Sequence, residues 1–119
     1  MEDSMEQRDI LVKARELISE REHWIRDGLG RNVLGKPLAE DALKDASCFC
    51  ALGAYLRAVQ ILQGDDTILS PPENAFEDLN NRVRRVHPEI KGYFPLVSFN
   101  DSHTHKDVLD LFDAMIAEV

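Results

Sequence analysis

The stretch Cys48–Leu62, CFCALGAYLRAVQIL, decides the fold of this 119-residue chain. Arg57 and Gln60 carry its only charged or amide side chains, so a helix over these residues is apolar almost all round. A helix of that kind is usually the central, buried one. Gly53 and Ala54 in its middle are small, and we therefore expect the backbone of a neighbouring segment to approach the helix closely there.

Apolar side chains at helical spacing predict three further helices around the central one. The four expected helices cover residues 5–27, 38–63, 71–86 and 105–119. Their start signals are Ser4, Pro37 (alternatively Asp45 for the central helix), Ser70, and a variant capping box from Thr104 to Asp107. The expected stop signals are Gly28, Gly64 and His87-Pro88.

Two segments rich in glycine or proline, residues 28–37 and 89–103, are expected to be ordered loops. Leu96–Phe99 would suit a strand, but the sequence offers no convincing partner for it. We therefore predict an all-α fold, a compact bundle of four main helices with two long ordered loops, in a single domain over residues 1–119. The side chains expected to be mostly buried are Leu17, Leu52, Leu56, Phe76, Leu79, Phe112 and Ile116.

The charge balance is acidic, with 22 Asp and Glu against 14 Lys and Arg and a net charge of −8. Nucleic-acid binding needs a broad basic face that displaces counterions from phosphates. Arg82, Arg84 and Arg85 are the only tight basic group. We therefore expect no nucleic-acid partner, and the acidity is typical of a soluble protein.

The location expected from the sequence is the cytoplasm. Cys48 and Cys50 are two residues apart, which in a helix directs their side chains away from each other and disfavours a disulfide. The chain has no apolar run of 18 residues, and its acidic start lacks the apolar region of a signal peptide. We expect free thiols and no membrane association.

Asn100 to His105 hold the densest group of polar side chains: an amide, a carboxylate, two hydroxyls and two imidazoles. Such residues before a helix usually serve turns and caps, and we favour that interpretation. The alternative is a cysteine hydrolase or transferase, in which Cys50 is the nucleophile, His103 or His105 the base, and Asn100 or Asp101 the orienting group. A cysteine in mid-helix is more often a small core side chain than a nucleophile.

Metal and cofactor sites are not expected. His103, His105 and Asp101 alternate along the chain, and a cysteine or His23 would have to complete their ligand set, but no CxxC or HExxH motif supports a metal ion. The glycines at 28 and 30 do not follow a strand and lack the spacing of a nucleotide loop.

The order of several short motifs resembles that of a family of small bacterial proteins of unknown function. The motifs are Trp24–Gly28, Gly35-Lys36-Pro37, Cys50–Ala54, and Phe99-Asn100-Asp101 ahead of a terminal helix. The resemblance covers roughly residues 14–119 and implies no activity. It implies that one spatial cluster holds Trp24, Gly28, Cys50, Gly53, Asn100 and Asp101.

The sequence favours a non-enzymatic binding or interaction module. Its partner is an unknown protein or small molecule, and a homodimer is a further alternative. The ligand-binding residues expected are Trp24, Cys50, Asn100 and Asp101, although a lone Trp is more often a packing anchor than a stacking surface. We also predict that Asn100 or Asp101 hydrogen-bonds to the 24–37 segment, because a polar side chain that leaves a buried segment must find partners.

Overall fold

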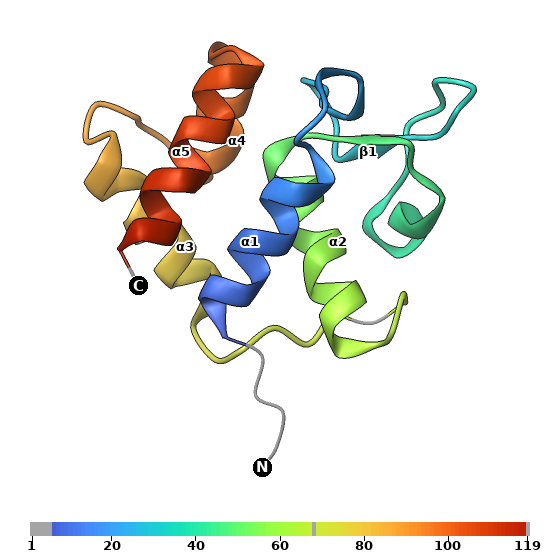
Figure 1. Ribbon diagram of the computed structural model, residues 1–119, viewed down its shortest axis with the longest axis horizontal. Coiled ribbons are helices and arrows are strands. Elements are labelled where there is room, and N and C mark those ends of the chain that lie inside the picture. The colour runs from blue at the N-terminus through green and yellow to red at the C-terminus, as the bar shows by residue number, and fades with distance from the viewer. Residues whose placement is uncertain (1–5, 68, 119) are drawn as a thin grey trace.

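The computed structural model of the protein describes residues 6–67 and 69–118 (Figure 1). The chain is mostly helical, so the predicted fold class is confirmed. Among the described residues the α-helices are α1 (Gln7–Leu17), α2 (Ala51–Gln63), α3 (Ala75–Val86), α4 (Pro95–Ser102) and α5 (His105–Ala117). Two 3-10 helices, η1 (Arg21–His23) and η2 (Glu40–Asp45), and two strands, β1 (Gly30–Arg31) and β2 (Cys48–Phe49), lie between α1 and α2.

Helix α2 is the central helix, as its composition predicts. Its most extensive contact is with α1, and it also contacts η2 and α4, while α5 contacts α1 and α3 (Figure 1). Its buried side chains include Tyr55 and Val59, and the buried Gln60 donates from Nε2 to the Glu40 carbonyl over 2.7 Å. Gly64 ends the helix in the left-handed conformation, with φ of 77°.

The central helix starts at Ala51, so the starts predicted at Pro37 and Asp45 are both wrong. The apolar residues before it are buried in other conformations: Leu43 in η2, and Phe49 in β2, which pairs with β1 in an antiparallel two-strand sheet. Because a buried stretch satisfies helical and extended patterns equally well, periodicity did not reveal the break. Cys50 is therefore the N-cap of α2 and not a mid-helix residue.

The first helix is shorter than predicted. Glu6 and Asp9 form its capping box, whereas the predicted cap Ser4 lies outside the described residues. The helix ends at Leu17 and not at Gly28. Trp24 is extended and forms a parallel bridge to Phe49, whose carbonyl accepts from the Ile25 amide over 3.0 Å.

Two boundaries differ on the C-terminal side. Helix α3 starts at Ala75, after Asn74 in the left-handed conformation, and not directly after Ser70. Residues 95–102, expected as loop or strand, form helix α4 with Pro95 in its first turn. The end of α3 before His87 and the capping box from Thr104 to Asp107 are confirmed.

The predicted core is correct at Leu56, Leu79 and Phe112, which are buried. Leu17, Leu52 and Ile116 are partly buried and pack against the core. Phe76 is 41% exposed, so its predicted burial is wrong. It lies in the first turn of α3, where its ring borders an open pocket and meets Tyr55 with ring centroids 5.8 Å apart.

Candidate functional site

Asn100 of α4 is the centre of a buried hydrogen-bond network. Its Oδ1 accepts from Trp24 Nε1 over 2.6 Å and from the Ala51 amide over 2.9 Å. Its Nδ2 donates to the Ile25 carbonyl over 3.0 Å and to Asp101 Oδ1 over 3.1 Å. Both acceptor positions and both donor hydrogens of the side chain are therefore used. We call these five residues the Asn100 network; it joins the segment after η1 to the start of α2 and the C-terminal end of α4.

Asp101 and Arg26 extend the network toward the surface. Asp101 Oδ1 also accepts from the Asp27 amide over 3.1 Å, and Arg26 Nη2 donates to the His103 carbonyl. Asp27 has φ of 59°, a left-handed conformation that this contact helps to hold. The prediction that Asn100 or Asp101 hydrogen-bonds to the 24–37 segment is confirmed for both residues.

Trp24 is a buried anchor in this structure. Its side chain is only 4% exposed. The guanidinium carbons of Arg21 and Arg26 lie 5.1 and 5.2 Å from the centroid of its ring, and the His105 ring lies 5.5 Å away. His105 is itself held, with Nε2 2.6 Å from the Ile18 carbonyl oxygen. These neighbours cover the indole, which leaves little of it for a ligand to stack on.

Gly53 is a point of very close approach between α2 and the glycine-rich segment. A Cβ atom at this position would lie 1.8 Å from the carbonyl oxygen of Leu29, far inside van der Waals contact. The same oxygen accepts from the Cys50 amide over 3.2 Å. The expected close backbone approach is thus confirmed, and it fixes the position of Leu29.

Cys50 is buried in the cluster, and its Sγ accepts from the Gly53 amide over 3.3 Å. Burial raises the pKa of the Cys50 thiol, and the nearby charge of Asp101 adds to that shift, although amide hydrogen bonds oppose it. A position at a helix N-terminus often lowers the pKa of a thiol, but at Cys50 the effect of burial, which raises the pKa, is larger.

Among the described residues, the candidate residues of the alternative hydrolase are engaged in other contacts. The His103 ring stacks on Phe99, with centroids 3.8 Å apart, and its Nδ1 faces the Phe99 carbonyl over 3.0 Å. Within the described residues no hydrogen bond links Cys50 to a histidine. Asn100, the predicted orienting group, uses all the donors and acceptors of its side chain within the network. The described residues also contain no group of three or more potential metal ligands.

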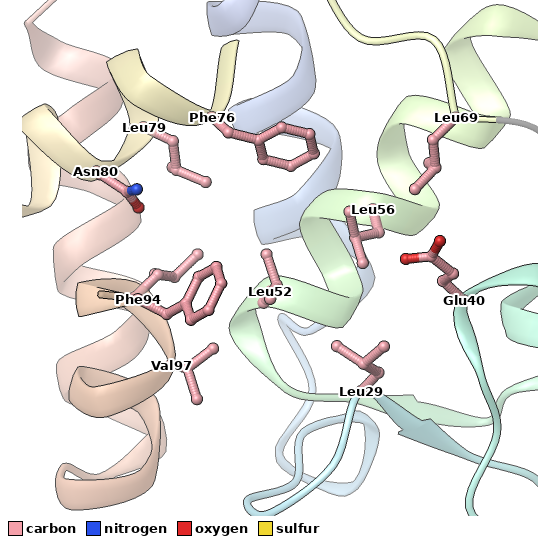
Figure 2. Close-up of a pocket in the computed structure, with 11 residues that line it drawn as sticks. Leu29, Glu40, Leu52, Leu56, Leu69, Phe76, Leu79, Asn80, Phe94 and Val97 are labelled. Atoms are coloured by element: carbon pink, nitrogen blue, oxygen red, sulfur yellow. The ribbon is translucent and has the colours of Figure 1, made fainter. Parts of the chain in front are cut away.

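A pocket of about 430 Å³ opens on the other side of α2, between α2, α3 and α4 (Figure 2). Nine of its eleven lining residues are apolar, and Glu40 and Asn80 are the polar ones. The apolar lining residues are Leu29, Leu52, Leu56, Leu69, Phe76, Leu79, Phe94, Leu96 and Val97. This composition is typical of small-molecule sites, which are mostly apolar with few polar groups.

Sequence reasoning missed this pocket, and none of the four predicted ligand-binding residues lines it. The only signal in the sequence was the aromatic pair Tyr93-Phe94 in a segment expected to be a loop. Leu29 links the two regions, because its carbonyl touches Gly53 on the network side and its side chain lines the pocket. Direct ligand contact by Trp24, Cys50 and the Asn100–Asp101 pair stays a prediction.

The geometry defines a mostly helical protein in which a fully hydrogen-bonded polar network lies beside an open apolar pocket. The chain belongs to a family of unknown function, DUF6197, whose model matches residues 3–118. The predicted resemblance to a family of unknown function is therefore confirmed. No curated protein and no solved structure matches the chain. Among the described residues, no helix is both long and apolar enough to cross a membrane.

Proposed function

We propose that this protein is a non-enzymatic binding module that takes a small apolar molecule into the pocket between α2, α3 and α4. The observation that carries the proposal is the apolar lining of this 430 Å³ pocket. Its volume lies in the range of about 300–1,000 Å³ that ligand sites in proteins occupy. The thiols of Cys48 and Cys50 are free, which supports a cytoplasmic location.

The exposure of two aromatic rings supports the proposal. Phe76 is 41% and Phe94 62% exposed, although both line the pocket. Covering exposed apolar surface with a ligand contributes about 25 cal/mol per Å² to the binding free energy. A ligand between these rings would therefore remove from water the side chains that folding leaves exposed.

The Asn100 network supports binding indirectly in this proposal. It holds Ala51 at the start of α2, and the neighbouring Cys50 amide donates to the carbonyl of Leu29, which lies in one wall of the pocket. A wall that is already in place lowers the entropy cost of binding. The proposed role of Trp24, Cys50, Asn100 and Asp101 is thus to position the pocket wall, with no chemical step.

The test is a fluorescence titration with 1-aminoanthracene, a neutral apolar probe whose emission rises in apolar surroundings. We expect the native protein to bind it, and Val97→Trp, which fills the pocket from α4, to bind it about tenfold more weakly. Val33→Trp is the matched control, because Val33 is 85% exposed and does not line the pocket. Circular dichroism confirms that both variants fold. No binding by the native protein, or equal loss in both variants, would refute the proposal.

A further inference from the structure

The pocket is lined by two polar side chains, the exposed Glu40 and the half-buried Asn80, and neither has a side-chain partner among the described residues. Within the described residues, neither the Glu40 carboxylate nor the Asn80 amide group makes a hydrogen bond or an ion pair. This contrasts with Asn100, all of whose hydrogen-bonding positions are filled. Figure 2 shows Glu40 and Asn80 on opposite sides of the pocket, with Leu52 and Leu56 of α2 between them.

The two groups differ in what they select. The amide of Asn80 both donates and accepts, so it does not distinguish a cation from a neutral or an anionic ligand. The carboxylate of Glu40 only accepts and is negatively charged, so it favours a cationic donor and repels an anion. The charge preference of the pocket therefore depends on Glu40.

The backbone of Glu40 is fixed beside the pocket. Gln60, buried on α2, donates from Nε2 to the Glu40 carbonyl over 2.7 Å. The carboxylate points back toward Leu56 in Figure 2, at the end of the pocket away from Phe94. A ligand with its apolar body between the two Phe rings would thus reach the carboxylate with its other end.

We infer that the ligand of this pocket is an apolar amine, whose protonated amino group pairs with Glu40 while its hydrocarbon part lies against Phe76 and Phe94. The inference rests on the proposed function and names its ligand class. The net charge of −8 on the whole chain favours the approach of a cation over that of an anion. The amine of such a ligand replaces the water that otherwise solvates the unpaired carboxylate.

The experiment compares three ligands of one shape: 4-phenylbutylamine, 4-phenylbutanol and 4-phenylbutanoate. Each displaces 1-aminoanthracene from the native protein, and the concentration for half displacement is measured at low salt and neutral pH. We expect the amine to displace the probe at a concentration about fivefold below that of the alcohol, and the carboxylate to be the weakest. In Glu40→Gln the amine and the alcohol should become equal.

Asp41→Asn is the matched control, because it removes the same charge from the same 3-10 helix at a residue that does not line the pocket. This control should retain the native order of the three ligands. Equal displacement by all three, or an order that Glu40→Gln leaves unchanged, would overturn the inference while the pocket proposal stands. Failure of the native protein to bind even the neutral probe and the alcohol would overturn both.

Discussion

The Asn100 network and the pocket lie on either side of the start of α2, and they treat polar groups in opposite ways. In the network every donor and acceptor of the buried Asn100 side chain is paired within the chain. In the pocket, the side chains of Glu40 and Asn80 pair with no described residue, and the rings of Phe76 and Phe94 stay partly exposed. A saturated network stabilises a fold, whereas unpaired groups beside exposed apolar surface are available to a ligand.

Asn100→Ala should produce the largest effect on the network. The change leaves the Trp24 indole N–H, the Ala51 amide and the Ile25 carbonyl without their partner. Each unsatisfied buried group costs about 1–3 kcal/mol, so we expect the free energy of unfolding in urea to fall by about 4 kcal/mol.

The matched control on the pocket side is Asn80→Ala. Its amide group has no partner to lose within the described residues, and we expect a change within about 0.5 kcal/mol. If both substitutions cost the same, the contrast between the network and the pocket is wrong.

Gly53→Ala tests the contact that joins the two regions. The added Cβ would lie 1.8 Å from the Leu29 carbonyl oxygen, which is backbone and cannot swing away. We expect the variant to lose about 2–3 kcal/mol of stability in a thermal or urea melt. Helix propensity alone predicts the opposite, a gain of about 1 kcal/mol. A higher melting temperature in Gly53→Ala would show that the close approach does not exist.

Alkaline pH should lower the free energy of unfolding through two buried side chains, Cys50 and Tyr55. Burial raises the pKa of Cys50 and also that of Tyr55, so both groups stay protonated in the folded state at a pH where the unfolded chain releases their protons. The contribution of these two groups to stability is then constant below the unfolded thiol pKa of about 8.5 and falls as the pH rises above it. We expect the free energy of unfolding in urea to fall as the pH rises above this pKa, and to fall less steeply in Cys50→Ala.

Alkylation of the same thiol separates the binding module from the hydrolase alternative. Single-cysteine variants Cys48→Ser and Cys50→Ser each leave one thiol for iodoacetamide in the native protein. Because Cys50 is buried with a raised pKa and Cys48 is half-buried, Cys50 should react about tenfold more slowly than Cys48. Faster labelling of Cys50 at neutral pH would favour a catalytic thiolate.

How far the sequence predicts this molecule depends on the kind of interaction. The apolar composition around Val59 identifies the central helix. The small size of Gly53 predicts the close approach of another backbone. The cost of an unpaired buried polar group predicts that Asn100 hydrogen-bonds to the segment that contains Trp24. The break before Ala51 could not be predicted, since the antiparallel pairing of β2 with β1 is a long-range contact that overrides local periodicity.

The pocket could not be predicted from the sequence for a similar reason. Phe76 has the spacing of a core residue in α3, and nothing local indicates that the side chains facing it from α2 and α4 leave a gap. The sequence predicts a loop at Leu96 and Val97, because Gly92 and Pro95 are loop signals when considered alone. A cavity is a property of three helices together, and periodicity describes one helix at a time.

Phe94→Ala should have the smallest effect on stability and a clear effect on binding. The ring is 62% exposed, so its removal should change the free energy of unfolding by less than about 1 kcal/mol. The same ring lines the pocket, and its loss should weaken 1-aminoanthracene binding about threefold or more. Tyr93→Ala is the matched control, because this neighbouring ring is 90% exposed and does not line the pocket. If Phe94→Ala destabilised the fold as strongly as Asn100→Ala, the ring would belong to the core, and the pocket would not be the region that folding leaves open for a ligand.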